Sequence, residues 1–284
     1  MILVTGATGH LGNAVIDNLL KTVSPNEIAA FARSEEKAAP LKAKGIQVRM
    51  GDYHDQAALA AAMQGIDKVL FISSSDFNDR PGQHRNVVDA AKNAGVKHIF
   101  YTGVTMKNAE RSAIGYLMAD HFTTDAYIKS SGLTYTLLQN NLYMEVLPMF
   151  LGEKVMETGV FFPGGIGKTA FVSRLDLAEA TANAITGTGH ENKTYQLTAP
   201  VAYSFADVAE MLSAQSGKSV AYTDAPAEVF ENVLKQAGLP EFVIRMSSSF
   251  GAAIKNEDFN ITNDTLENLL GRRPVDLRDF LKAF

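Results

Sequence analysis

Residues 2–12 read Ile2-Leu3-Val4-Thr5-Gly6-Ala7-Thr8-Gly9-His10-Leu11-Gly12. The β-branched run at 2–5 predicts a strand, and apolar residues at helical spacing predict a helix over 10–22. Glycines between a strand and a helix let the chain turn tightly and let a pyrophosphate approach the backbone. The helix N-terminus then offers unpaired N–H groups and a partial positive charge. Gly6, Gly9 and Gly12 therefore predict a dinucleotide-binding turn.

Short β-branched runs alternate with helical patterns from residue 1 to about 140. Strands are predicted at 2–5, 28–32, 46–50, 68–72, 98–102 and 134–138, with helices at 10–22, 35–43, 55–63, 83–94 and 121–130. Strands that alternate with helices indicate βαβ crossovers and a parallel sheet covered on both faces. The sequence thus predicts the α/β class, with a doubly wound parallel sheet of the Rossmann type.

This alternation breaks down after residue 140, where helical patterns dominate. Helices are predicted at 175–185, 205–216, 227–237, 263–270 and 276–283, and short strands at 159–162, 194–197 and 219–222. Glycine and proline gather at 163–167, which predicts an exposed turn or lid. We expect a dinucleotide-binding domain over 1–150 and a smaller, mostly helical substrate-side lobe over 151–284. Parts of 151–200 are expected to return to the first domain.

Composition excludes several classes of protein. The 284 residues hold 26 Lys+Arg against 31 Asp+Glu, a formal net charge of −5, and no basic run that would bind nucleic acid or an anionic membrane. There is no cysteine, which excludes disulfides, thiolate metal sites and cysteine nucleophiles. No apolar run approaches the ~18 residues of a membrane span, and residues 2–4 are too short for a signal peptide. A cytoplasmic protein is the default expectation.

Arg33 bears on which dinucleotide is bound. It ends the second predicted strand, 33 − 12 = 21 positions after Gly12. An acidic residue at this distance usually binds the ribose diol of NAD, whereas a guanidinium suits the 2′-phosphate of NADP. The alternative is a solvated arginine beside Glu35 and Glu36. We expect NADP(H), with Asp52 either near the adenine or capping its own loop.

Several stretches resemble one known family. They are Gly6 to Gly12, Arg33, Gly51-Asp52-Tyr53, Phe71 to Ser75, Gln83 to Val88, Ala90 to Lys92, Ala94 to Lys97, Tyr135 to Leu138, Gly189 to Glu191 and Ser216 to Lys218. Together they resemble the NmrA-like branch of the atypical short-chain dehydrogenases. Within it they are most similar to the bacterial NAD(P)H:quinone oxidoreductases of type 2 and the triphenylmethane reductases. The resemblance runs nearly end to end and weakens after about residue 225.

The resemblance implies a set of residues that contact the cofactor. They are Gly6, Ala7, Thr8, Gly9, His10, Leu11, Gly12, Arg33, Ser73, Ser74, Ser75, Leu138, Gln139, Asn140, Asn141, Leu142, Tyr143 and Arg174. Two departures matter. The family's Arg-Asn pair after the sixth strand reads Gln139-Asn140 here, which removes one cationic contact. The segment between Tyr101 and His121 also differs from that of the relatives, and the choice of substrate is expected to depend on this difference.

The Tyr-x-x-x-Lys pair of short-chain dehydrogenases would fall at Leu117 and His121, and neither residue fits. Hydride transfer to a quinone tolerates this absence, since the product is a phenolate that water can protonate. Asn141 and Tyr143 are our first candidates to donate a hydrogen bond to the acceptor; their alternatives are loop capping and an aromatic or core contact. His121 would bond the nicotinamide ribose or relay a proton, unless it is an ordinary helix histidine. His84 is interpreted as a packing residue.

Three functions remain in view. The first is an NADPH-dependent reductase of quinones or similar electron-poor aromatics, whose planar substrate would meet a wall of Met144, Met149, Met156, Phe150, Phe161 and Phe162 unless these residues are ordinary core. The second is a non-catalytic NADP(H)-binding redox sensor of the NmrA type. The third, a nucleotide-sugar epimerase or ketone reductase, needs the missing Tyr-x-x-x-Lys. No histidine pair has metal-ligand spacing, so no metal is expected.

Overall fold

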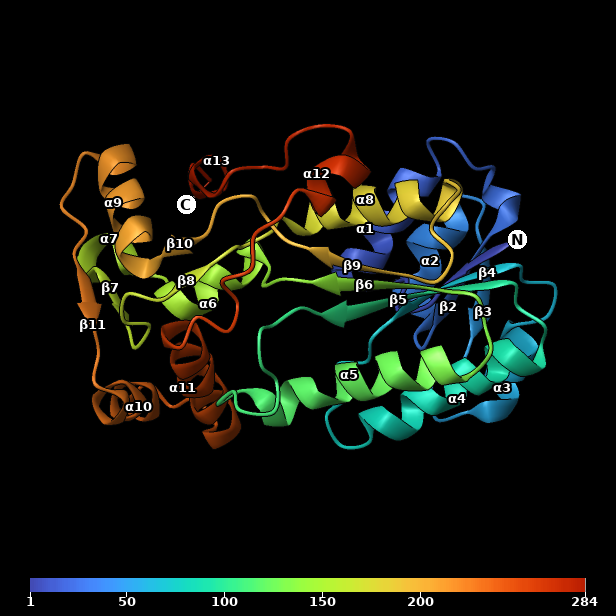
Figure 1. Cartoon of the computed structure of the whole chain (residues 1–284), viewed down its shortest axis with the longest axis horizontal. Helices are drawn as coiled ribbons and strands as arrows, with labels where there is room; N and C mark the ends of the chain where they lie inside the picture. Colours follow the sequence, from blue (N-terminus) through green and yellow to red (C-terminus); the bar gives the residue numbers. More distant parts are fainter. Residues whose placement is uncertain (284) are drawn as a thin grey trace.

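The core of the molecule is a sheet of seven parallel strands in the order β3-β2-β1-β4-β5-β6-β9 (Figure 1). The computed structural model describes residues 1–283. The strands are β1 (Ile2–Val4), β2 (Ile28–Ala32), β3 (Gln47–Met50), β4 (Lys68–Ile72), β5 (His98–Val104), β6 (Tyr135–Asn140) and β9 (Lys193–Leu197). The doubly wound Rossmann fold predicted from the sequence is confirmed.

Alternating side chains of these strands enter two separate cores. Leu3 and Phe71 face one core and Val4 and Leu70 the other. Each core lies between one face of the sheet and the helices that cover that face (Figure 1). Helices α3, α4 and α5 cover the core of Leu3 and Phe71, and α1, α8 and α12 cover the core of Val4 and Leu70. The helices of this body are α1 (His10–Leu19), α2 (Glu35–Ala43), α3 (Gln56–Ala62), α4 (Arg80–Asn93), α5 (Gly115–Ser130), α8 (Arg174–Thr186) and α12 (Thr265–Leu270), with a 3₁₀ turn η1 (Pro25–Glu27).

The strand order reverses between β1 and β4, because the chain leaves β1 toward β2 on one side and returns to β4 on the other. In such sheets ligands bind in the crevice outside the carboxyl ends of the strands at this point. The loops after β1, β4, β5 and β6 all emerge at that edge.

A second lobe packs beside the carboxyl ends of the strands (Figure 1). Its elements are η2 (Met144–Val146), α6 (Leu147–Leu151), α7 (Val155–Thr158), β7 (Val160–Phe162), β8 (Lys168–Thr169), β10 (Tyr203–Ser204), α9 (Phe205–Ser216), β11 (Tyr222–Asp224), α10 (Ala227–Gln236), α11 (Glu241–Lys255) and α13 (Leu277–Leu281). Phenylalanine rings at 150, 162 and 205 stack in its core. Between the lobe's segments the chain returns to the sheet body through α8 and β9, and later through α12.

The sequence prediction was wrong about parts of the lobe. It missed α11, whose Ser247-Ser248-Ser249 run and Gly251 are weak helix formers. Tertiary packing holds this helix in place, because a Cβ on Gly251 would lie 2.6 Å from the Pro163 ring. The turn at 163–167 is therefore mostly buried against α11 and is not an exposed lid, although Ile166 within it is 92% exposed. The third short strand lies at 222–224 and not at 219–222.

Two helices also begin earlier than predicted. The first turn of α4 begins at Arg80, three residues before the predicted start, after Asp79 caps the N–H of Gly82. Helix α5 begins at Gly115 and not at 121. The earlier start of α4 adds Arg80 to the residues that line the cleft, whereas the earlier start of α5 adds none.

Candidate functional site

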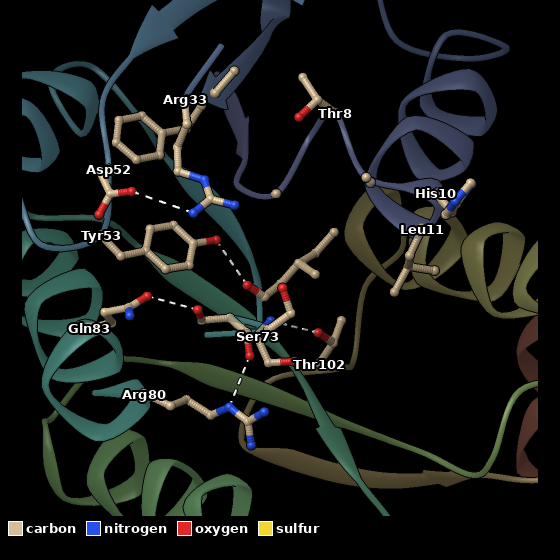
Figure 2. A pocket seen from close by; sticks show the side chains of 18 of the residues that line it. Thr8, His10, Leu11, Arg33, Asp52, Tyr53, Ser73, Arg80, Gln83 and Thr102 are labelled. Carbon is tan, nitrogen blue, oxygen red and sulfur yellow. Dashed lines mark hydrogen bonds and ion pairs between the residues drawn. The ribbon is translucent and has the colours of Figure 1, made fainter. Parts of the chain in front are cut away.

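One cleft of about 520 Å³ runs along the carboxyl edge of the sheet, from the β1 turn to the start of α5 (Figure 2). It is lined by Gly6, Thr8, Gly9, His10, Leu11, Gly12, Phe31, Ala32, Arg33, Lys37, Asp52, Tyr53, Ile72, Ser73, Ser74, Ser75, Phe77, Arg80, Gln83, Thr102, His121, Tyr143 and Arg174. Most of the sequence-predicted cofactor residues thus share one cavity.

The glycine turn forms the floor of one end of this cleft. Gly6 adopts a positive φ of 59°, which favours glycine, and a Cβ on Gly12 would lie 2.4 Å from the Gly6 carbonyl oxygen. The backbone N–H groups of His10, Leu11 and Gly12 have no acceptor among residues 1–283. No acidic side chain occupies the first turn of α1. This turn therefore presents free donors and positive helix potential, which suit a pyrophosphate.

Arg33 stands at the far side of the same end, with its side chain 72% exposed (Figure 2). Its Nη1 lies 3.7 Å from the Asp52 carboxylate, and Lys37 lies on the next helix. Asp52 also accepts the His54 N–H at 2.9 Å, so it caps its loop as well as facing the cleft. Two cations at this position fit the doubly charged 2′-phosphate of NADP better than the neutral diol of NAD.

Tyr53 closes the floor between β1, β3 and β4. Its hydroxyl bonds Thr5 Oγ1 at 2.6 Å and the Ile72 carbonyl at 2.9 Å, and its ring stacks on Phe31. Burial raises the pKa of the Tyr53 phenol, which therefore stays protonated. It is a rigid wall beside Arg33.

The serines after β4 are fixed by neighbouring side chains. The Ser73 N–H donates to Thr102 Oγ1 at 3.1 Å, and the Ser74 N–H donates to His84 Nε2 at 3.0 Å. Because His84 accepts at Nε2, its proton lies on Nδ1 and is donated to Thr124 Oγ1 at 2.7 Å. Burial is the main cause that lowers the pKa of His84 to about 3. The predicted packing role of His84 thus gains a second part, since this neutral imidazole holds the loop.

His121 lies on α5 at the other end of the cleft. The Tyr101 hydroxyl lies 3.0 Å from His121 Nδ1. Burial raises the pKa of Tyr101, so the phenol keeps its proton and donates it to that nitrogen. Burial first, and then the charge of Arg80, lowers the pKa of His121 to about 3. His121 is therefore neutral at pH 7 and carries its proton on Nε2. This N–H has no hydrogen-bond acceptor among the described residues.

Tyr143 and Arg174 face the cleft from the segment after β6 and from the start of α8. The Arg174 guanidinium lies 5.0 Å from the centre of the Tyr143 ring. The Tyr143 hydroxyl accepts from Asn140 Nδ2 at 3.2 Å, and the Arg174 N–H donates to Glu145 at 2.9 Å. Both residues line the cleft, and their contact with a cofactor stays a prediction.

The remaining predicted residues do not line the cleft. Asn141 is 2% exposed; its Nδ2 donates to the Phe259 carbonyl at 3.0 Å and its Oδ1 accepts the Leu142 N–H. This geometry is that of the loop-capping alternative. Asn141 does not donate a hydrogen bond to the molecule that accepts the hydride. The others have structural contacts instead: Ala7 and Leu138 lie in the sheet core, Leu142 in the lobe core, Gln139 on Asp125 and Asn140 on Tyr143.

The predicted substrate wall is also wrong. Met144, Phe150 and Phe162 are buried in the core of the lobe, and Met149 is 47% exposed outside the cleft. Neither Met156 nor Phe161 lines the cleft. Apart from Met149, these residues follow the core alternative, because the lobe needs its own apolar centre.

Sequence reasoning missed Lys37, Phe77, Arg80, Gln83 and Thr102. The signal for Arg80 was available in Asp79-Arg80-Pro81, where Asp at the N-cap and Pro in the first turn mark a helix start. Thr102 ends β5 at the edge that such sheets use for ligands. Phe77 gave no signal, because only the fold brings it to α11, where its ring lies 5.5 Å from that of Phe242.

The residues present fit a nicotinamide dinucleotide phosphate. The free N–H groups of α1 suit the pyrophosphate, a Cβ at Gly12 would collide with the turn itself, and Arg33 with Lys37 suits the 2′-phosphate. Within residues 1–283 no cluster of side chains could hold a metal ion. In the same range no helix has the length and apolar character needed to cross a membrane.

This fold and cleft define the class of dinucleotide-binding α/β proteins of the Rossmann type. The sequence profile of the NmrA-like family matches residues 1–280, and the chain belongs to that family.

Individual relatives match over nearly the whole chain. Quinone oxidoreductase 2 of Escherichia coli is 40% identical over 280 residues, which cover 98% of this chain and 96% of the relative. The structure of NADPH-dependent quinone oxidoreductase from E. coli complexed with NADPH has a TM-score of 0.91 at 38% identity, covering 100% of this chain and 99% of the other. Citrobacter sp. triphenylmethane reductase complexed with NADP(H) has a TM-score of 0.92 at 37% identity, covering 99% of both chains.

Proposed function

We propose that this protein is an NADPH-dependent reductase that delivers hydride to quinones or similar electron-poor aromatic compounds. The observation that carries the proposal is a single cleft that joins a phosphate-binding end, at Gly12 and Arg33, to an aromatic and histidine-lined end, at Phe77, His121 and Tyr143. The names of the relatives, which include an NADPH-bound quinone oxidoreductase and a dye reductase, support the same activity.

The phosphate-binding end would position the cofactor. The N–H groups of His10, Leu11 and Gly12 would bind the pyrophosphate, and Arg33 would bind the 2′-phosphate. The reduced nicotinamide supplies the hydride when it is bound. Since no tyrosine and lysine pair stands at 117 and 121, the chain's contribution is alignment and electrostatic stabilisation of the acceptor.

His121 would donate a hydrogen bond at the acceptor end. It is not a proton source at pH 7, because its pKa is lowered to about 3 and it is already neutral. The bond from Tyr101 to Nδ1 sets the tautomer, and Nε2–H then faces an acceptor that gains negative charge. Tyr143, held by Asn140 and Arg174, would wall the same end. The proton that completes the product comes from water.

The proposal is tested by mixing purified protein with NADPH and either 1,4-benzoquinone or a triphenylmethane dye while following the absorbance band of the reduced cofactor. We expect oxidation that depends on both protein and acceptor and that is faster with NADPH than with NADH. Tight NADPH binding without turnover on any acceptor would instead favour the redox-sensor function. We propose the cytoplasm, which holds a pool of NADPH, as the compartment; localisation of a tagged copy tests it.

A further inference from the structure

Arg80 is a buried cation within the cleft that the roles assigned so far do not use. It is the first residue of α4, its side chain is only 4% exposed, and it lines the same cavity as Ser74 and His121 (Figure 2). Its Nε donates to the Ser74 carbonyl at 2.9 Å and its Nη1 to the Leu117 carbonyl at 2.8 Å. The Nη2 group has no hydrogen-bond partner among residues 1–283.

The charge of Arg80 has no direct counter-ion. None of the ion pairs within the described chain includes it. Asp76 and Asp120 act on it only from a distance, and Asp76 is already engaged by Gln83 and by the Asn78 N–H. A guanidinium remains charged even when buried. Burying a cation beside neutral carbonyls alone is therefore unfavourable.

The position of Arg80 in its helix is also unfavourable. The N-terminus of a helix carries partial positive charge, which disfavours a cation in the first turn. Arg80 thus combines two unfavourable features, a buried charge without a direct counter-ion and a cation in the first turn of a helix. Such local conflicts concentrate at functional sites, where a ligand supplies what the fold lacks. The missing partner here is an anion in the cleft.

A flat aromatic surface lies beside this positive charge. The guanidinium carbon of Arg80 is 4.6 Å from the centre of the Phe77 ring, and Phe77 is 44% exposed. The Phe77 ring also lies 5.5 Å from the ring of Phe242 on α11, at a tilt of 48°. A planar ring entering here would meet an aromatic face and a guanidinium edge together, which matches an aromatic molecule with an anionic oxygen.

We propose that Arg80 is a catalytic residue whose guanidinium binds the acceptor oxygen that becomes negative as hydride arrives. The inference rests on the proposed function. The nicotinamide C–H bond breaks, the hydride forms an O–H bond at one quinone oxygen, and NADPH becomes NADP⁺. The ring becomes aromatic and the second quinone oxygen holds the negative charge until it takes one proton from water. The positive field of Arg80 and the α4 N-terminus stabilises that hydroquinone monoanion.

The influence of Arg80 already reaches the neighbouring groups of the acceptor end. Its positive charge is the second cause, after burial, of the lowered pKa values of both His84 and His121. A positive charge that adds to burial in disfavouring the protonated imidazoles acts in the same sense on a phenol, favouring its ionised form.

The first experiment measures which charge form of a phenol the site prefers. The probe is 4-nitrophenol, which carries one hydroxyl on a planar ring and changes colour on ionisation. Wild-type protein saturated with NADP⁺ is titrated with it across a range of pH. We expect the phenolate to bind about tenfold more tightly than the phenol, as for a charge-assisted hydrogen bond. Equal binding of the two forms overturns the proposal.

The second experiment compares Arg80→Met with Arg85→Met. Arg85 lies on the same helix, is exposed, and stands over the Tyr127 ring at 5.9 Å, away from the cleft. We expect Arg80→Met to lose the phenolate preference and to lower kcat with benzoquinone by about a hundredfold, the usual effect of removing an oxyanion donor. NADPH affinity should stay unchanged. Arg85→Met should behave as wild type in all three measurements.

Arg80→Lys keeps the charge without the planar fork, and it should retain a reduced preference for phenolate. If Arg80→Met does not fold, as judged by its thermal transition, the Lys variant and the wild-type titration decide the question. An Arg80→Met protein that folds and keeps the phenolate preference overturns the proposal. If wild-type protein oxidises no NADPH with any quinone, the proposed function fails, and the nitrophenol result then reports separately on whether Arg80 binds anions.

Discussion

The two ends of the cleft are built in different ways. At the phosphate-binding end the groups available to a ligand are backbone N–H groups of one continuous turn, Gly6 to Gly12. At the acceptor end they are side chains from three separate segments: Phe77 and Arg80 from the loop after β4 and the start of α4, His121 from α5, and Tyr143 from the segment after β6. The first end recognises a group common to all dinucleotides, and the second recognises whatever substrate the chain has been selected to reduce.

This difference teaches where change is tolerated. A backbone donor survives most substitutions, so only residues that the turn geometry requires are critical there. A side-chain donor is lost with a single substitution, and its own orientation depends on further residues such as Tyr101 beneath His121. We therefore expect damaging substitutions at the phosphate-binding end to disrupt the turn and abolish cofactor binding. At the acceptor end we expect them to lower kcat while cofactor binding is kept.

The largest expected effect is that of Gly12→Ala. The new Cβ would lie 2.4 Å from the Gly6 carbonyl oxygen and 2.9 Å from the Ala7 Cα, so helix α1 must move from the turn. We expect loss of NADPH binding by calorimetry and a stability lower by about 1–3 kcal/mol, as for overpacking. Gly9→Ala is the matched control, because its Cβ meets only the Gly6 oxygen at 3.2 Å. Equal damage from both would contradict the close-packing argument.

The second effect is at the cofactor phosphate. Arg33→Ala should weaken NADPH about tenfold and leave NADH almost unchanged, because it removes one solvent-exposed charge-assisted contact. Asp52→Asn should act in the opposite direction, since the carboxylate 3.7 Å from the guanidinium competes with the phosphate. Dissociation constants for both cofactors are the measurement. A similar loss for NADH would refute the assignment of Arg33 to the 2′-phosphate.

The third effect separates rate from affinity at the acceptor end. Tyr101→Phe removes the donor that sets the His121 tautomer, and it leaves the buried ring in place. We expect kcat with benzoquinone to fall about tenfold, the lower end of a lost positioning bond, while NADPH affinity is retained. In His121→Gln the amide keeps a hydrogen-bond donor but has no tautomer for Tyr101 to set. Adding Tyr101→Phe to this variant should therefore leave its kcat unchanged. Additive losses in the double variant would argue against a shared role.

The fourth effect is on the pH dependence of stability, and it is small only near neutral pH. The pKa of His84 is lowered to about 3 in the folded protein, against about 6.5 unfolded. Between these pKa values the unfolded chain binds more protons than the folded protein. The contribution of His84 to the free energy of unfolding is therefore complete above about pH 6.5, and it falls on acidification by up to about 1.4 kcal/mol per pH unit.

One carboxyl group opposes this trend. Burial raises the pKa of Asp125 to about 6, so its contribution is greatest below about pH 4 and is lost as pH rises through 6. Asp125→Asn should thus make the decline between pH 7 and 5 steeper than in wild type. Urea unfolding at the two pH values measures both slopes, and identical slopes would contradict the raised pKa.

The sequence sufficed for the sheet body because its signals are local. The strands at 28–32 and 68–72 and the helix at 35–43 lie where the pattern put them, since buried parallel strands are continuously apolar and helix ends carry their own caps. Helix α11 was missed because serine and glycine there are held by Pro163 and not by propensity.

The site divides in the same manner. The glycine turn and Arg33 follow from spacing along the chain. The place of Arg80 depends on where α4 begins, which Asp79 and Pro81 indicate in the sequence although the prediction did not use them. The place of Phe77 depends on how the lobe folds back against the loop after β4, which no adjacent residue indicates. Asn141 shows the converse error, because a polar residue after a sheet strand can turn inward, as its bond to Phe259 requires.

The contact between Phe77 and Phe242 has a consequence for which molecules are admitted. The rings stand 5.5 Å apart, tilted by 48°, and each is nearly half exposed, so they form an exposed aromatic contact between the loop after β4 and helix α11. Parting two such rings forfeits only about 1 kcal/mol and breaks no hydrogen bond between them. If the proposed function holds, we expect a small rotation of these two side chains to admit bulkier aromatic acceptors, so that the reduction potential of an acceptor would matter more than its size.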